Sequence, residues 1–270
     1  MTSEKQDSLI VKAALTQPET SATKISTALS KKGLFVSPTT VRRRLKEAGL
    51  RHGPPLSKPL LKKNHLQKRL QFARTNQKND FQNVIFSDET TFRLYGLTKK
   101  VWRKVRSQVV VRTVKHSQKV HAWGCFSAKG FGSLFLFTQN LNAKFLVDIY
   151  NKALLPSAKK WFPDPEDGWV LQEDNDPKHT SKLAKKWRDQ KGVVRLPWPA
   201  QSPDLNLIEN VWSVMKIRVA QQHPKSLDDL KRIIKKEWKS LQKELANNLV
   251  ESMIRRIDQV ITNKGDFATY

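Results

Sequence analysis

The chain has 270 residues, 38 % of them hydrophobic and 9 % aromatic, which is enough apolar material for a folded core and excludes wholesale disorder. Fifty Lys and Arg against 24 Asp and Glu give a formal net charge of +26, which favours a polyanionic partner: nucleic acid first, an anionic membrane surface second. The single cysteine, Cys125, excludes a disulfide framework and a cysteine-based zinc site. No apolar run reaches the roughly 18 residues of a membrane span, and the N-terminus lacks the pattern of a secretory signal, so we expect a soluble intracellular protein.

The positive charge is concentrated toward the N-terminus. Residues 1–80 carry 17 Lys and Arg against 5 Asp and Glu, whereas the other 190 residues carry 33 against 19. This asymmetry predicts a basic binding module followed by a larger folded domain. We place the module at residues 1–53, a basic linker at 54–80 and the larger domain at 81–270.

The first 50 residues have the pattern of three short helices. Apolar residues recur at helical spacing over 7–15 and again over 22–29, and Gly33 stops the second stretch. Ser37 is suited to be an N-cap and Pro38 the first residue of a third helix, which carries four basic residues up to Lys46. A helix, a glycine turn and a capped basic helix together predict a helix-turn-helix.

In a helix-turn-helix, the first residues of the second helix meet base edges in the major groove. The residues expected there are Thr39, Thr40, Arg42 and Arg43, with Arg44 and Lys46 as phosphate contacts. The alternative interpretation is a basic, solvated face of a small helical domain.

The region predicted as a linker is basic and contains two adjacent prolines, Pro54 and Pro55, which a helix cannot continue through. A helix is expected over about 64–74. Two interpretations stay open: the linker tracks the backbone of DNA, or it is a solvated tether. Its basic run is also weakly consistent with a nuclear import signal.

From residue 82 the pattern changes to strands, followed by alternating helices and strands. Strands are expected over 83–88, 91–96, 119–127, 132–137, 168–172 and 193–196, with helices over 141–162 and 180–190. Ser202, Pro203 and Asp204 have the residue types that open a long helix. This order predicts an α/β domain in which helices flank a mixed sheet.

Three acidic residues stand out in this domain. Asp88 and Asp174 are expected at strand ends and Glu209 two turns into the long helix, and ligand crevices of α/β sheets lie at strand ends. Carboxylates gathered in one place repel one another unless hard cations neutralise them, and carboxylate oxygens suit Mg²⁺. Each acid also has an ordinary structural explanation, as a turn residue or a surface residue.

Longer motifs around these acids resemble the catalytic blocks of the mariner-type transposases, in the branch with two aspartates and a glutamate. The three strings are FSDET at 86–90, QEDNDPKHTS at 172–181 and WPAQSPDLNLIENVW at 198–212. The 34 residues between Asp174 and Glu209 match that branch. The strings VWRK at 101–104 and AWGCFS at 122–127 are similar to further family strings, and residues 37–45 resemble the recognition helix of the family's second helix-turn-helix.

The resemblance implies an N-terminal helix-turn-helix and an RNase H-like catalytic domain that performs cut-and-paste DNA transposition. It carries the catalytic, metal-binding positions to Asp88, Asp174 and Glu209. The implied cofactor is Mg²⁺, with Mn²⁺ as a substitute, as two ions that assist hydrolysis at the transposon ends and strand transfer into target DNA at TA sites. The implied partners are the terminal repeats, target DNA and a second or further copies of the chain, in the nucleus.

Other polar residues near these motifs are outside the implied ligand set. Glu89, Glu173 and Asp176 are candidates for supporting the ligands, and Lys178 and His179 for contacting DNA phosphate or making structural hydrogen bonds.

The sequence departs from the family pattern in two places. It begins where the family's second helix-turn-helix would begin, and Leu207 stands where the family usually has proline. One alternative is therefore a transposase-derived, catalytically defective, sequence-specific DNA-binding protein. A second alternative is a nuclease of the same fold that acts on RNA–DNA hybrids. The three acids favour the transposase.

Overall fold

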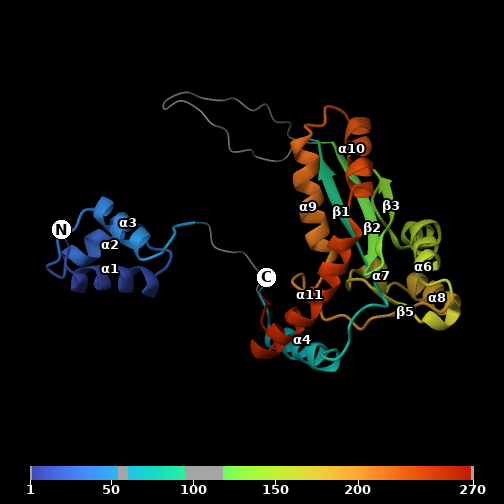
Figure 1. Cartoon of the computed structure of the whole chain (residues 1–270), viewed down its shortest axis with the longest axis horizontal. Coiled ribbons are helices and arrows are strands. Elements are labelled where there is room, and N and C mark those ends of the chain that lie inside the picture. Colours follow the sequence, from blue (N-terminus) through green and yellow to red (C-terminus); the bar gives the residue numbers. More distant parts are fainter. Residues whose placement is uncertain (1, 54–59, 95–117, 269–270) are drawn as a thin grey trace. The chain divides into compact units, whose positions relative to one another are not determined.

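The computed structural model describes residues 2–53, 60–94 and 118–268, and the chain divides into two compact units, Met1–Lys58 and Pro59–Tyr270 (Figure 1). The string at 101–104 and residues 54–59 of the expected linker lie outside the described residues. None of the described helices is long and apolar enough to cross a membrane.

The first unit is a bundle of three helices: α1 Glu4–Thr16, α2 Ala22–Ser30 and α3 Pro38–Glu47. Each helix begins after a serine whose side chain accepts a hydrogen bond from the backbone N–H three residues on, which stabilises the first turn. The apolar core is small and consists of Ile10, Ile25, Leu29 and Val41. The predicted helix-turn-helix is confirmed, with Pro38 as the first residue of α3.

The helix expected inside the linker exists as α4, Lys63–Thr75, but it belongs to the second unit. It packs against α11, Lys243–Thr262, and buries Arg69, Phe72 and Ala73. The expectation of a linker extending to residue 80 therefore differs from the structure. The many basic residues of this segment suggested a solvated linker, although one face of its helix is buried.

The second unit contains a mixed five-stranded sheet in the order β3-β2-β1-β4-β5. The strands are β1 Val84–Arg93, β2 Lys119–Ser127, β3 Gly130–Phe137, β4 Val170–Gln172 and β5 Val194–Arg195. Strands β1, β2 and β3 are antiparallel, while β4 is parallel to both β1 and β5. The predicted mixed sheet flanked by helices is confirmed.

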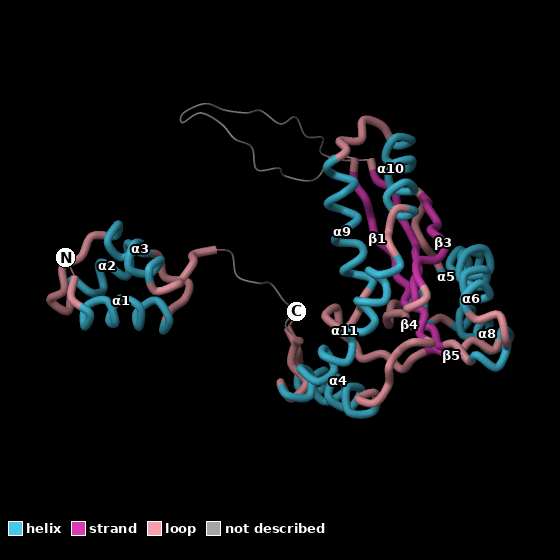
Figure 2. The backbone as a smooth tube through the Cα atoms, in the orientation of Figure 1, coloured by secondary structure: helices cyan, strands magenta, loops and turns pink. Residues whose placement is uncertain are grey.

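Helices cover both faces of this sheet (Figures 1 and 2). One layer contains α5 Ala143–Ile149, the π-helical turn Tyr150–Leu154, α6 Leu155–Trp161, the short α7 Pro177–Thr180 and α8 Lys182–Lys191. The other layer contains α4, α9 Ile208–Gln221, α10 Leu227–Lys239 and α11. A separate hydrophobic cluster fills each interface between sheet and helices.

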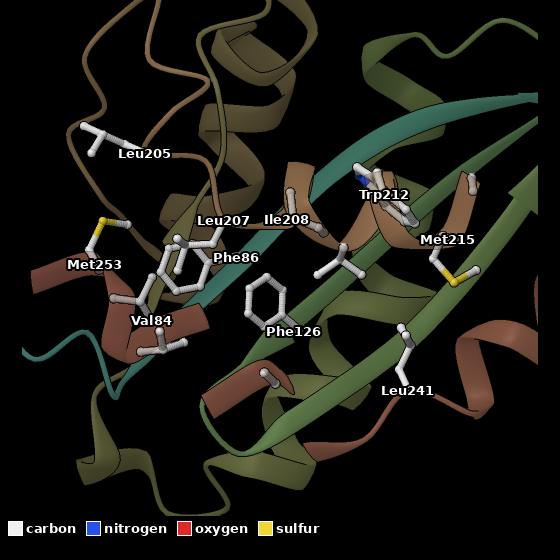
Figure 3. Close-up of a cluster of buried hydrophobic side chains, with 14 of the residues drawn as sticks. Val84, Phe86, Phe126, Leu205, Leu207, Ile208, Trp212, Met215, Leu241 and Met253 are labelled. Carbon is white, nitrogen blue, oxygen red and sulfur yellow. The ribbon is translucent and has the colours of Figure 1, made fainter. Parts of the chain in front are cut away.

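The larger cluster fixes the segments on which the acidic residues lie. Phe86 of β1, Phe126 of β2 and Ile208 of α9 are fully buried in it, together with Trp212 (Figure 3). A side chain at Gly124 would lie 2.7 Å from Trp238 and 2.8 Å from Trp212, so only glycine allows these rings to reach the sheet. This packing holds the first turn of α9 against β1.

Strand β1 differs from the prediction of two strands, over 83–88 and 91–96, because it runs without a break through the polar stretch between them. Asp88 pairs with Gly124 and Glu89 with Trp123 of the neighbouring strand β2. Asp88 therefore lies in the middle of β1 rather than at its end.

The long helix also begins later than predicted, at Ile208 instead of Ser202. The Ser202 hydroxyl donates to the carbonyl of Ala200 instead of capping a helix, and Asp204 binds Arg69 of α4. Glu209 consequently lies in the first turn of α9, not two turns into it.

Candidate active site

The register between two parallel strands places Asp88 and Asp174 at one level. Phe86 of β1 is paired with Gln172, the last residue of β4, and each aspartate follows two residues later. Beyond Gln172 strand β4 no longer covers β1, so a crevice opens beside Asp88. The expectation that both aspartates end strands is therefore correct only for Asp174, which follows the end of β4.

A pocket of about 430 Å³ lies in this crevice. All three predicted acids, Asp88, Asp174 and Glu209, line it together with Asp176. The opposite wall is the loop that leads into α9, from Trp198 to Asn206. Of the residues that the structure describes, four acids and no Lys or Arg line this pocket, in a chain with a net charge of +26.

Both carboxylate oxygens of Asp88 accept hydrogen bonds. The backbone N–H of Glu89 lies 2.7 Å from Oδ1, and the side-chain amide of Asn206 lies 2.9 Å from Oδ2. Burial, followed by the charges of Glu89 and Glu209, raises the pKa of Asp88 to about 8. Burial and the neighbouring acids thus disfavour the ionised form of the Asp88 carboxyl group.

Asp174 is anchored through one oxygen. Its Oδ1 lies 2.9 Å from the backbone N–H of Asp176 and 2.7 Å from Nδ1 of His179. Burial acts to raise the pKa of Asp174, but the hydrogen bonds from His179 and Asp176 outweigh it and lower the pKa. Asp174 is therefore ionised and held at a fixed orientation.

His179 is buried between two acids from different elements. Its Nε2 lies 3.1 Å from Oε1 of Glu89 on β1. Burial alone would lower the pKa of His179, but its hydrogen bonds to Asp174 and Glu89 raise it to about 10. The imidazole is therefore protonated at neutral pH, and both of its nitrogens donate. Lys178 adds ion pairs of 3.6 Å to Glu89 and 2.8 Å to Asp176.

Glu173, next to Asp174 in the chain, is fully buried and lies among arginines instead of in the pocket. Its carboxylate accepts from Arg188 at 2.7 Å, pairs with Arg195 at 3.0 Å and receives the Tyr150 hydroxyl. Arg195 also donates to the backbone carbonyl of Asp174 at 2.8 Å. This network fixes the chain at the point where Asp174 turns toward the pocket.

Glu209 is placed by the start of α9. Its backbone N–H donates to the carbonyl of Asn206 at 3.1 Å, and an acidic residue in the first turn suits the positive end of the helix dipole. Since Asn206 also donates to Asp88, this one residue ties two of the acids together. Sequence reasoning missed Asn206, because its partner Asp88 lies 118 residues away in the chain.

The residues of the pocket have the chemistry to hold divalent cations. Four carboxylates line one space, none of the basic side chains that the structure describes lines it, and carboxylate oxygens are preferred ligands of Mg²⁺ and Mn²⁺. In the described parts of the chain, no three Asp, Glu, His or Cys side chains stand close enough together to grip one ion. Binding an ion therefore requires these acids to move closer together around it.

The residues predicted to contact DNA all lie on α3, Pro38–Glu47. Thr39, Arg42, Arg43 and Lys46 are exposed, and Thr40 is partly buried with its hydroxyl 3.0 Å from that of Ser37. Arg44 is different: it pairs with Asp7 at 3.3 Å and Glu47 at 2.6 Å, and donates to the Thr2 hydroxyl. Arg44 thus ties α3 to the N-terminal segment of the bundle.

Comparisons with known proteins match both units. A model described as "DDE superfamily endonuclease" matches residues 83–231, and one of a Tc3-type transposase helix-turn-helix matches residues 7–78. The Tc1 transposase of Caenorhabditis elegans is 32 % identical over 275 residues, covering 98 % of this chain and 100 % of the relative. The Tcb2 transposase of Caenorhabditis briggsae is 34 % identical over 278 residues, covering 96 % and 98 %.

Solved structures with a similar fold are those of the Mos1 transposase. Its paired-end complex with the left transposon end has a TM-score of 0.82 at 16 % identity, covering 99 % of this chain and 81 % of that one. Its strand transfer complex has a TM-score of 0.82 at 16 % identity, covering 100 % and 81 %. These structures support the fold, while the Caenorhabditis relatives establish the family. The chain belongs to the Tc1/mariner family of transposases.

Proposed function

We propose that this chain is a divalent-metal-dependent DNA transposase that cleaves the ends of its transposable element and joins them to target DNA. The observation that carries this proposal is a pocket that Asp88, Asp174 and Glu209 line and that none of the described basic residues lines, in a strongly basic chain of this family. We assign the three acids as ligands of Mg²⁺, with Mn²⁺ as a substitute, in a site for two ions. The Mos1 catalytic domain has been solved with Mg and with Mn, which supports both metals.

The protein's own contribution is positioning. Strands β1 and β4 hold Asp88 and Asp174 at one level, Asn206 ties Asp88 to the start of α9, and Glu209 faces them from that helix. When bound, two ions activate water and stabilise the attacking and leaving oxygens of a phosphodiester. The acids keep that chemistry at one place, and the loop 198–206 walls it on the opposite side.

The helix-turn-helix is the candidate reader of the terminal repeats. The exposed Thr39, Arg42 and Arg43 lie at or near the N-terminal end of α3, where a recognition helix meets base edges, and Lys46 is a candidate phosphate contact. Paired-end complexes of Mos1 hold transposon ends, which supports a dimer or larger assembly on DNA for this chain. By the same family likeness we propose action in the nucleus and insertion at TA.

Cleavage of a supercoiled plasmid that carries candidate terminal repeats tests the proposal. We expect wild type to nick this plasmid with Mg²⁺ or Mn²⁺, and Asp174→Asn not to. Asp228→Asn is the matched control, because Asp228 is an exposed aspartate on α10, away from the pocket. Nicking by Asp174→Asn at the wild-type rate would refute the ligand assignment. Salt-sensitive DNA binding without nicking by any variant would favour a non-catalytic DNA-binding protein.

A further inference from the structure

His179 joins the two strands that carry the catalytic aspartates. Its side chain is 2 % exposed, with Nδ1 2.7 Å from Asp174 and Nε2 3.1 Å from Glu89. Glu89 follows Asp88 directly on β1, and Asp174 follows the end of β4. The imidazole therefore bridges the point where β4 stops pairing with β1, where no ladder hydrogen bond fixes the spacing.

The bridge also selects which oxygen of Asp174 is free. Oδ1 is occupied by His179 and by the backbone N–H of Asp176, and the hydrogen bonds of the described residues leave Oδ2 open. Asp174 lines the pocket, and its side chain is 49 % exposed. An aspartate whose one oxygen is held by hydrogen bonds presents its other oxygen in a fixed direction. Residues that hydrogen-bond to metal ligands commonly fix their orientation in this way.

We propose that His179 is a positioning residue that sets the orientation of Asp174 and its distance from β1, so that the site is preorganised for divalent metal. This inference rests on the proposed function, since it takes Asp174 as a metal ligand. It assigns His179 neither to DNA contact nor to metal binding. The competing explanation is that His179 only stabilises the fold.

Two conservative variants separate the two hydrogen bonds. Asparagine places its amide where Nδ1 lies and keeps the bond to Asp174, whereas glutamine places its amide near Nε2 and keeps the bond to Glu89. His179→Ala removes both bonds. His52→Ala is the matched control, because His52 is an exposed histidine of the other unit.

The first measurement is the Mn²⁺ concentration that gives half of the maximal rise in melting temperature of the full chain without DNA. We expect His179→Ala and His179→Gln to need roughly 10–100-fold more Mn²⁺ than wild type, and His179→Asn to need clearly less than either. Nicking at saturating Mn²⁺ should recover partly in His179→Gln. A purely structural role would lower the melting temperature without metal and leave the Mn²⁺ requirement unchanged.

An unchanged Mn²⁺ requirement in His179→Ala, or an equal requirement in the Asn and Gln variants, would overturn the inference. If His179→Ala fails to fold, the comparison of His179→Asn with His179→Gln still tests whether the bond to Asp174 sets the Mn²⁺ requirement. Asp174→Asn distinguishes a failure of the proposed metal site from a failure of the role proposed for His179. If wild type and Asp174→Asn respond to Mn²⁺ alike, the proposed metal site itself is wrong. If Asp174→Asn loses the response while His179→Ala responds at the wild-type Mn²⁺ concentration, His179 is not its positioning residue.

Discussion

Two groups of acids in the second unit differ in their surroundings. Asp204 and Glu173 are buried and neutralised by arginine: Asp204 accepts two bonds from Arg69, at 2.8 and 2.6 Å, and Glu173 pairs with Arg188 and Arg195. Asp88, Asp174 and Glu209 share a pocket whose lining contains no Lys or Arg. Both groups are close together in the chain, since Glu173 precedes Asp174 and Asp204 lies five residues before Glu209.

The acids paired with arginine stabilise the fold, whereas the acids of the pocket are the proposed metal ligands. A buried carboxylate paired with a guanidinium ties distant segments together, and losing one partner leaves an uncompensated charge. Burial, followed by the charges of Glu89 and Glu209, raises the pKa of Asp88 to about 8, so this position disfavours a carboxylate without a bound cation. Substitutions in the first group should therefore cost stability, and substitutions in the second group should cost activity.

The largest expected effect is on activity at Glu209. Glu209→Gln removes a proposed metal ligand, and because metal contributes several kcal/mol to catalysis, nicking should fall by about 10³-fold or more. The free energy of unfolding without metal should change by less than about 1 kcal/mol, because the Glu209 carboxylate makes no hydrogen bond or ion pair with the described residues and only its interaction with the helix dipole is lost. Plasmid nicking and urea unfolding measure the two effects. A large loss of stability in Glu209→Gln would contradict the distinction between structural acids and pocket acids.

The next effect is on stability at Arg69. Arg69→Met leaves Asp204 buried and unpaired, which should lower the free energy of unfolding by about 3–5 kcal/mol. Adding Asp204→Asn removes the orphaned charge and keeps an acceptor for the Ala268 N–H, 2.8 Å away. The double variant should therefore be more stable than Arg69→Met in urea unfolding. Equal stability of the two would show that packing, not charge, dominates.

An intermediate effect is expected at Asn206, which belongs to the pocket but carries no charge. Asn206→Ala removes the donor to Asp88 and should weaken metal affinity by about 10–100-fold, the usual cost of losing a group behind a ligand. The Mg²⁺ concentration for half-maximal nicking measures it. Asn248→Ala, an exposed position on α11, serves as the control and should match wild type.

The last expected effect, similar in free energy to the one at Asn206, is the stabilisation by metal itself. Mg²⁺ at 100 times its dissociation constant should add about 2.7 kcal/mol to the free energy of unfolding, and a chelator should remove it. Glu209→Gln should lose most of this gain, whereas Asp228→Asn should keep it. If the metal stabilised Glu209→Gln as much as wild type, Glu209 would not be a ligand.

The sequence alone determined the features that depend on local residues. Ser37 and Pro38 predicted the start of α3, and the apolar residues over 119–127 predicted β2 with its observed bounds, Lys119–Ser127. The three acids were identified by their motifs, which need no knowledge of neighbours in space. These signals are legible because capping, periodicity and motif spacing act over a few residues.

Only the tertiary structure decided which distant groups meet. Asp204 looked like the first turn of a helix, but Arg69, 135 residues away, holds it in a loop and delays α9 to Ile208. The segment around α4 looked like a tether because its buried face depends on contact with α11. His179 and Asn206 likewise show their partners only after β1, β4 and α9 come together, because side-chain hydrogen bonds over long sequence separations leave no periodic signal.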